Sequence, residues 1–496
     1  MPVYFLEIIV VALGLLMLMV DAFAPVTDKR AIAWIGMLGL VITFALLFYV
    51  KWPESTEGVF WKFYTSEDSL SLFFKGIALL TTLVVLIMAV EFTPVVVEQT
   101  AAAAKGAHPQ AGLGEFFALP MFACAGLMWM ASANHLVSIF VALETVTITF
   151  YVMVAYLRRN VGSLEAGVKY LILGALSTGF LVYGFAWLYG TTGSMELPAI
   201  SAALASPEVN RVAALFAFGL ILVALAFKVG AAPFHLWIPD VYQGAPTPIT
   251  AFLSVGSKAA GFLVLLRLVA PYLASAPLVG KVSLVLAVLA GLSLLFGNLA
   301  ALPQRNFKRL LAYSSIAHAG FLLMALASSP LMEANSAALS PAKVIAFYLG
   351  AYLLMTLLAF LVITILRTQI PSEDLDAYKG LAKRAPFLAF ALLVAMASLA
   401  GIPLTAGFFG KLFVFKIALE QHQWALLVLG LIGAGAGFYY YLKIAASMFL
   451  ETPDGKSAPV ATTAIVISPL ARVAIVVLIV LIFAAGVNPA LILGLL

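Results

Sequence analysis

Four ionisable side chains stand inside long apolar stretches of this sequence, where a charge is costly. Glu144 lies near the middle of the stretch HLVSIFVALETVTITFYVMVAY, and Lys228, Lys258 and Lys411 lie in comparably apolar surroundings. Placing an ionisable group at the centre of a bilayer costs at least about 2.5–3.5 kcal/mol, so a group that persists there is a candidate functional site. Carboxylates and amines change protonation when their surroundings change. The chemistry that these residues predict is proton transfer.

Glu144 and Lys228 form the pair in which we expect this transfer to be switched. A carboxylate alone in apolar surroundings becomes neutral, whereas a nearby ammonium group keeps it ionised. Bringing the two groups together therefore favours the ion pair. Separating them removes a proton from the lysine or adds one to the glutamate. The alternative is a static ion pair that fixes the packing of two helices.

Two histidines and a further lysine extend this polar series. His235 and His318 can relay protons because histidine titrates near neutral pH, although each could equally be a hydrogen-bonded packing residue. We expect Lys169 about 10 Å deep in its span, at 1.5 Å per residue. It is therefore another candidate for the relay.

The remaining basic residues of the apolar stretches, and the single cysteine, suggest structural roles. Lys75, Arg267 and Lys443 lie within about two turns of a predicted helix end. We therefore expect their long side chains to extend to the membrane interface. Cys124 is expected to be a small buried residue. Because it is the single cysteine, an intramolecular disulfide is excluded. No acid and histidine stand at the spacing of metal ligands, so a metal site is not expected.

The composition places these residues in a membrane protein. Of the 496 residues 64% are hydrophobic and 10% are charged, whereas soluble domains have about 25% charged residues. A soluble enzyme, a disordered chain and a disulfide scaffold are therefore excluded. The net charge of +5 comes from basic residues scattered over short connections, with no run longer than a pair. This pattern does not indicate nucleic-acid binding.

About fourteen segments are long and apolar enough to cross a membrane as helices. A helix needs about 20 mainly apolar residues to do so, and membrane strands would instead alternate over about ten residues. The segments are 3–24, 31–51, 69–93, 112–131, 134–156, 162–190, 211–238, 245–270, 281–301, 307–329, 341–367, 386–418, 423–450 and 470–495. The fold class is therefore an all-α polytopic membrane protein.

The basic residues between the spans predict an orientation. The odd-numbered connections hold fourteen Lys and Arg residues and the even-numbered ones hold six. Because positively charged loops stay in the cytoplasm, we expect both termini on the non-cytoplasmic side. The motif Ala22-Phe23-Ala24 resembles a signal-peptidase site, but Glu7 and the absence of a basic leader favour a retained first helix.

Two interrupted helices suggest an internal repeat. Helices four to eight (112–270) and nine to thirteen (271–450) resemble two copies of one five-helix unit, after three helices in 1–111 and before a last one in 451–496. Because each unit has an odd number of helices, the second copy is expected to be inverted. The fourth helix of each copy holds Gly and Pro residues that break helices, and paired breaks point to an ion site in transporters. The predicted breaks are Gly230 and Pro233 in the first copy, and Gly401, Pro403 and Gly407 in the second.

Three stretches resemble a known family. KVGAAPFHLWIPDVYQGAPTPITAFLSVGSKAAGF (228–262) is similar to the central signature of the antiporter-like subunits of respiratory complex I, the proton-pumping NADH:quinone oxidoreductase, and most of all to its subunit N. NFKRLLAYSSIAHAGF (306–321) and AGIPLTAGFFGKLFVF (400–415) resemble the tenth and twelfth helices of that family. The resemblance extends over essentially the whole chain.

The resemblance implies a function and a set of residues. Glu144, Lys228, Lys258 and Lys411 match the family's glutamate and lysines of helices five, seven, eight and twelve, while Lys169 and His235 match polar residues that link them. His318 extends the route within the tenth helix. The family implies a translocase subunit that moves protons while other subunits reduce quinone. It also implies a multi-pass protein of the bacterial plasma membrane.

The same resemblance implies partners. NADH, FMN, iron–sulfur clusters and quinone are expected in partner subunits, and this chain itself carries no nucleotide-binding glycine motif or cysteine cluster. The expected partners are the other membrane subunits, lipids and the transported protons. The alternatives are a subunit of a multi-subunit cation/proton antiporter or of a membrane-bound hydrogenase-type complex, and a purely structural membrane spacer. NADH and ferredoxin both remain possible electron donors.

Overall fold

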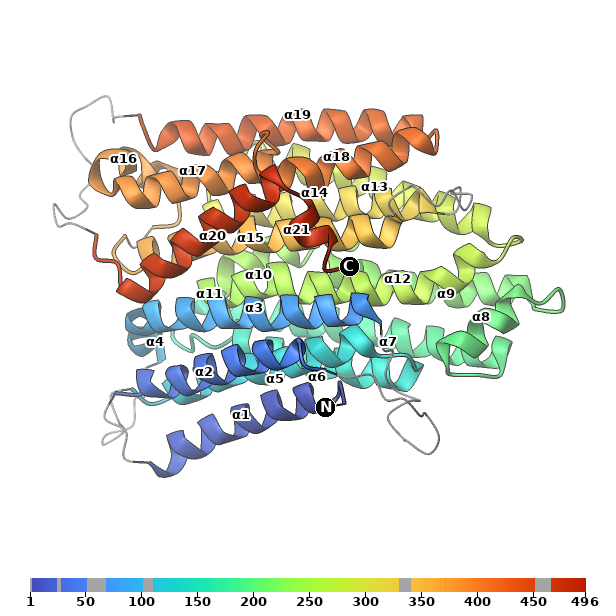
Figure 1. The fold of residues 1–496 in the computed structure, drawn as a ribbon, viewed down its shortest axis with the longest axis horizontal. Helices are drawn as coiled ribbons and strands as arrows, with labels where there is room; N and C mark the ends of the chain where they lie inside the picture. Colours follow the sequence, from blue (N-terminus) through green and yellow to red (C-terminus); the bar gives the residue numbers. More distant parts are fainter. Residues whose placement is uncertain are drawn as a thin grey trace.

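The computed structural model describes residues 2–24, 28–50, 68–100, 110–329, 340–370, 372–450 and 465–496. Within these ranges the chain is helical, and its only extended pairings are two isolated bridges, His135 with Glu196 and Asn306 with Asp374. The long helices run side by side, with the N-terminal ones at one edge and α19 at the opposite edge (Figure 1). The all-helical prediction is confirmed.

Thirteen helices of the described residues are long and apolar enough to cross a membrane. They are α1 (Phe5–Phe23), α2 (Arg30–Leu47), α3 (Ser69–Glu91), α5 (Leu113–Ser132), α6 (Leu136–Val154), α7 (Val161–Thr192), α9 (Arg211–Val229), the continuous unit Thr247–Ala274, α13 (Val279–Ala301), α14 (Phe307–Ala327), α15 (Pro341–Arg367), α19 (Trp424–Ser447) and α20 (Pro469–Val487). The remaining predicted span is two shorter helices, α17 (Pro386–Ala400) and α18 (Ala406–Glu420). Every predicted segment therefore corresponds to a helix or a helix pair.

Short elements join these spans. They are α4 (Thr93–Thr100), α8 (Leu197–Ala205), α10 (Ile238–Gly244), a 3₁₀ turn (Leu375–Tyr378), α16 (Leu381–Arg384) and α21 (Ala490–Leu493). Side-chain caps fix where several spans begin. Asn160 accepts a hydrogen bond from the Ser163 amide at 3.3 Å, and Asn306 accepts one from the Arg309 amide at 3.0 Å. Such caps satisfy amides that the first turn of a helix leaves free.

Corresponding helices of the two predicted repeats pack in the same way. The pair α5 and α6 of the first repeat corresponds to the pair α13 and α14 of the second. In the same way, α7 packs against α9 where α15 packs against α17. Finally, α9 packs against α12 where α17 packs against α19. This agreement supports the repeat. The residue boundaries proposed for the repeats remain predictions. The orientation also remains a prediction, and Lys51, Lys62, Lys105 and Lys456, which enter its charge count, lie outside the described residues.

Both predicted helix breaks are present. α9 ends at Val229 because Gly230 adopts a left-handed conformation (φ 77°), and α10 begins only at Ile238, beyond Pro233. α17 ends at Ala400 because Gly401 does the same (φ 87°), and Pro403 lies in the link to α18. Glycine favours this conformation because it lacks a Cβ atom.

The prediction that Gly407 is part of the second break is wrong. Gly407 lies in the first turn of α18, and its amide donates a hydrogen bond to the Ser398 hydroxyl at 3.2 Å. A Cβ atom there would lie 1.9 Å from the Ser398 carbonyl oxygen. Gly407 therefore permits the close approach of α18 to α17 and does not end a helix.

A third irregularity was not predicted. The span Thr247–Ala274 consists of α11 (Thr247–Phe252), a π-helical turn (Leu253–Ser257) and α12 (Lys258–Ala274). A π-helical turn inside an α-helix is rare and frequently marks a functional site. Here it directly precedes Lys258.

Candidate functional site

Glu144 and Lys228 lie near each other but do not form a direct ion pair. Glu144 of α6 accepts a hydrogen bond from the Thr178 hydroxyl of α7 at 2.8 Å. Lys228, at the end of α9, donates to the Thr147 hydroxyl at 2.9 Å. Thr147 lies one turn along α6 from Glu144, on the same face. Each member of the predicted pair therefore has a threonine hydroxyl as its hydrogen-bond partner.

Lys258 is surrounded by neutral groups. Its side chain is buried, and the ammonium group contacts both the backbone carbonyl and the hydroxyl of Ser315 in α14. It also lies over the ring of Tyr352, 5.4 Å from the centroid. Ser315 contacts the Tyr242 hydroxyl at 3.2 Å. No carboxylate forms an ion pair with Lys258 in the described part of the chain.

His318 continues the series one turn further along α14. Its Nδ1 atom lies 2.7 Å from the Tyr348 hydroxyl, and its Nε2 atom lies 3.2 Å from the Tyr441 hydroxyl. The ring also lies 5.0 Å from that of Tyr352, which faces Lys258. A buried histidine with two hydroxyl partners can pass a proton between its two nitrogens.

Lys411 turns back onto the second helix break. Its ammonium group donates to the carbonyl oxygens of Leu399 at 3.0 Å and Ala400 at 2.9 Å, the last residues of α17. These carbonyls are free because α17 ends there. A Cβ atom at Gly401 would lie 3.1 Å from the lysine Cδ atom. The break therefore supplies both the acceptors and the space for this side chain.

The structure brings these groups into one row. Gly261, three residues after Lys258, packs against the Lys228 side chain. A Cβ atom at Gly261 would lie 3.4 Å from Lys228 Cγ. Phe321, one turn beyond His318, lies 5.5 Å from the Lys411 ammonium group. We call this row the polar axis, and its members are Glu144, Thr147, Lys228, Lys258, Ser315, His318 and Lys411. α14 provides its centre.

Lys169 lies outside the polar axis, which corrects its expected place in the relay. Its side chain is 42% exposed and pairs with Asp240 and Glu165, each at 2.7 Å. Thr178, which contacts Glu144, is nine residues further along α7, a rise of about 13 Å. Lys169 therefore does not link Glu144 to Lys228. Its partner Asp240 lies on another helix, α10, so counting residues along one span could not show where this side chain lies.

His235 is buried in the first helix break but joins none of the other candidates. Its ring lies 5.8 Å from that of Phe296 in α13. Its Nδ1 atom is buried and has no hydrogen-bond partner among the described residues. A relay through His235 remains a prediction that no contact in the structure supports.

A polar cavity of about 450 Å³ lies beside Lys169, and its charged lining was not predicted. Asp240 there accepts hydrogen bonds from Lys169 and from Arg309, both at 2.7 Å. Burial alone would raise the pKa of Asp240. The two basic partners outweigh that effect and hold the pKa below its usual value. The acidic residue in the stretch PDVYQGAP, Asp240, is the sequence feature that could have indicated this charged cavity.

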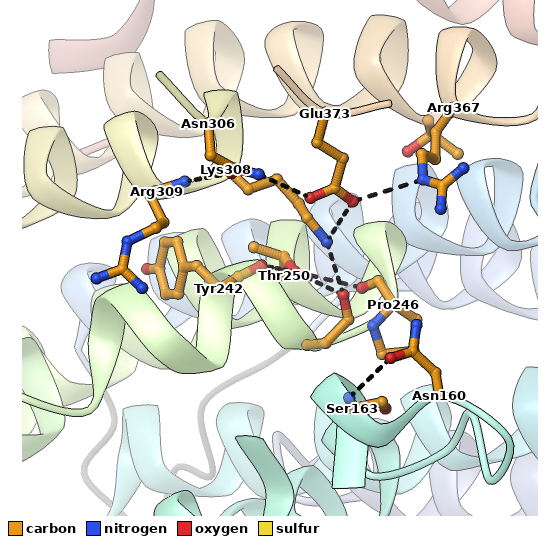
Figure 2. A network of polar contacts seen from close by, with 12 residues as sticks. Asn160, Ser163, Tyr242, Pro246, Thr250, Asn306, Lys308, Arg309, Arg367 and Glu373 are labelled. Carbon is orange, nitrogen blue, oxygen red and sulfur yellow. Dashed lines mark hydrogen bonds and ion pairs between the residues drawn. The ribbon is translucent and has the colours of Figure 1, made fainter. Parts of the chain in front are cut away.

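A partly buried ion-pair network adjoins this cavity (Figure 2). Lys308 contacts Glu373 at 2.9 Å and donates to the Ala245 carbonyl at 3.0 Å, while Arg367 lies 3.6 Å from Glu373. The network ties the turn before α11 to the connection between α15 and α17. It therefore joins the two predicted repeats at one end of the helices.

No group of three or more His, Cys, Asp or Glu residues in the described ranges could hold a metal ion. Cys124 is buried, as expected for a packing residue. The side chains that contact the charged candidates and that sequence reasoning missed are neutral: Thr147, Thr178, Ser315, Tyr348, Tyr352 and Tyr441. Hydroxyl groups are common in membrane helices, so their types alone gave no signal.

Comparison with known proteins identifies similar chains. The model of a family described as NADH:quinone oxidoreductase/Mrp antiporter, transmembrane, matches residues 133–437. NADH-quinone oxidoreductase subunit N of Desulforamulus reducens is 37% identical over 474 residues, which cover 94% of this chain and 93% of the relative. The subunit N of Trichlorobacter lovleyi is 36% identical, with 93% and 91% covered.

Solved structures agree with this result. A chain of respiratory complex I from Thermus thermophilus with bound aureothin has a TM-score of 0.78 and 34% identity, and the match covers 99% of this chain and 98% of that one. A chain of the Mrp complex from Dietzia sp. has a TM-score of 0.74 at 21% identity, covering 99% and 96%. The second likeness shows the shared fold.

Proposed function

We propose that the polar axis of this chain carries protons through the membrane arm of a respiratory complex. The chain belongs to the family of membrane subunits shared by NADH:quinone oxidoreductase and Mrp antiporters. The relatives named subunit N cover nearly the whole chain, and the resemblance to that subunit is confirmed. The chain is therefore a subunit of a translocase complex, with other membrane subunits as its partners.

One observation supports the proton route above all others. Lys228, Lys258 and Lys411 are buried, and the partners of their ammonium groups are hydroxyls and backbone carbonyls. A carboxylate would hold each lysine in its charged form. Neutral acceptors favour the charged form much less than a carboxylate does, so a lysine among them can release its proton and take up another. Three such lysines in a row form a series of proton-holding positions.

The roles of the individual residues follow from their places in the row. Glu144 and Lys228 respond to each other's charge and begin the route, Lys258 is the central position, and His318 connects it to Lys411. Lys411 releases the proton beside the second break.

We assign the energy supply to quinone reduction in partner subunits, which would also hold NADH, FMN and iron–sulfur clusters. Both termini lie on the non-cytoplasmic side of a bacterial plasma membrane.

Replacing Lys258 with arginine tests the route. Arginine keeps the charge and does not deprotonate in proteins, so Lys258→Arg should retain assembly while proton pumping per quinone reduced falls to near background. Pumping is measured in vesicles that contain the assembled complex, and assembly is checked on a native gel. Lys343→Arg, at the exposed start of α15, is the control and should pump normally. Normal pumping by Lys258→Arg would exclude proton exchange at this residue.

A further inference from the structure

The contact between α6 and α7 holds a row of polar groups that leads from the polar axis toward the polar cavity. On α7, Tyr170, Gly174 and Thr178 follow one another at intervals of four residues, which places them on one face of the helix. On α6, Tyr151 comes two turns after Glu144. Glu144 meets Thr178 at 2.8 Å, and Tyr151 meets the earlier residues Gly174 and Tyr170. The two helices therefore run antiparallel, with the tyrosines on the side of Glu144 that faces the start of α7.

Gly174 makes room for the hydroxyl group of Tyr151. A Cβ atom at Gly174 would lie 2.1 Å from the Tyr151 hydroxyl oxygen, so this oxygen lies directly against the backbone of α7. Thr178, the hydrogen-bond donor to Glu144, is one turn further along the same helix face. The Tyr151 hydroxyl oxygen is buried and has no hydrogen-bond partner among the described residues.

Tyr170 has the same property one turn nearer the cavity. Its side chain is fully buried, and its hydroxyl oxygen has no hydrogen-bond partner in the described part of the chain. Its ring lies 5.1 Å from that of Tyr151 and 4.8 Å from that of Trp237. Lys169, the residue before Tyr170, lines the cavity together with Asp240, which follows Trp237 by three residues. Tyr170 therefore lies at the inner end of the cavity.

Two neighbouring buried hydroxyl groups without protein partners call for an explanation, because an unsatisfied polar group is unfavourable in an apolar interior. Phenylalanine rings would pack in the same places without this penalty. Internal water satisfies buried polar groups of this kind, and the adjoining polar cavity of about 450 Å³ is large enough to hold it. A tyrosine hydroxyl both donates and accepts a hydrogen bond. Two of them joined by water form a continuous hydrogen-bonded chain.

We propose that Tyr170 and Tyr151, bridged by internal water, carry protons between the polar cavity and Glu144. This inference rests on the proposed function, and it names the groups that deliver protons to the start of the route. The tyrosines divide the distance from Tyr170 to Thr178, a rise of about 12 Å along α7. At each hydroxyl an O–H bond forms on the cavity side while another breaks on the Glu144 side. The hydroxyl then turns back, so no tyrosinate forms and the chain gains no proton.

Removing one hydroxyl while keeping its ring tests this branch. Tyr170→Phe should assemble normally, whereas its rate of proton pumping in vesicles should fall by about tenfold. Tyr272→Phe is the matched control, because Tyr272 is equally buried near the end of α12, packs against Phe218 and also has a hydroxyl without a partner in the described ranges. This control should assemble and pump normally. Normal pumping by assembled Tyr170→Phe complex would leave only aromatic packing for this residue and would overturn the inference.

A double variant tests whether the two hydroxyls act in one branch. Groups in series are not independent, so Tyr151→Phe combined with Tyr170→Phe should pump no more slowly than Tyr170→Phe alone. Losses that multiply would contradict a single branch. Lys258→Arg separates this inference from the proposed function. Normal pumping by Lys258→Arg contradicts the proposed function, whereas blocked pumping there with normal pumping by Tyr170→Phe contradicts the tyrosine branch alone.

Discussion

Lys75 of α3 and Lys258 of α12 are both buried inside candidate membrane spans, but their ammonium groups have different partners. Lys75 contacts the carboxylate of Glu7, whereas Lys258 contacts the carbonyl and hydroxyl of Ser315. A buried lysine with a carboxylate partner stays charged and joins two helices. A lysine with neutral partners is free to exchange its proton. The comparison teaches that the partner, and not burial, distinguishes this ion-paired lysine from the lysines of the proposed proton route.

The largest effect is expected at Lys411, whose partners are the neutral carbonyls of Leu399 and Ala400. Lys411→Arg and Lys411→Met should both assemble and should both lose pumping by about tenfold or more. Arginine cannot release a proton and methionine cannot hold one. Quinone-coupled pumping in vesicles and native gels are the measurements. If Lys411 only caps α17, the arginine variant will pump normally, and the comparison will fail at this residue.

The opposite behaviour is expected at Lys75. Lys75→Met leaves the buried Glu7 charge without its partner, which costs roughly 3–5 kcal/mol, so the complex should inactivate at a lower temperature and assemble less well. Pumping per assembled complex should stay normal. Adding Glu7→Gln should restore much of the stability because the unpaired charge is gone. Loss of pumping from fully assembled Lys75→Met complex would place this lysine in the proton route after all.

The smallest effect is expected at the half-exposed pair of Lys169 and Asp240. The pKa of Asp240 is lower in the folded chain than in the unfolded one, so its ionised form stabilises the fold at any pH above the ordinary carboxyl pKa. This stabilisation is lost as the pH falls through the lowered pKa. Solvent-exposed pairs contribute about 0.2–1 kcal/mol. Asp240→Asn should therefore lower thermal stability slightly at pH 7 and not in acid. Thermal unfolding across pH checks this, and a difference that grows in acid would contradict the pairing.

Much of the fold could be predicted because membrane spans follow from apolar length alone. The two breaks were also predictable, since Gly230 and Gly401 each end a helix in a conformation that glycine favours. Gly407 was misread because a glycine needed for close packing and a glycine that ends a helix look the same in a sequence. The π-helical turn before Lys258 could not be predicted, because the residues LSVGS show no pattern that distinguishes it from an α-helix.

The candidate site was predicted in its charges and missed in its neutral groups. Lys228, Lys258 and Lys411 were identifiable because an amine inside an apolar stretch is conspicuous. Lys75 and Lys169 were misjudged because their partners, Glu7 and Asp240, lie on other helices. Which lysine has a carboxylate beside it depends on how the helices pack, and the sequence gives no distance between them.

Changing the partner of Lys258 while keeping the lysine tests the central claim most directly. Ser315→Asp places a carboxylate beside the ammonium group, and Ser315→Asn introduces a side chain of the same shape without the charge. Both variants should assemble, and proton pumping by Ser315→Asp should fall to a small fraction of that of Ser315→Asn because the new ion pair holds Lys258 charged. Equal pumping by the two assembled variants would contradict the claim that neutral partners allow the buried lysines to exchange protons.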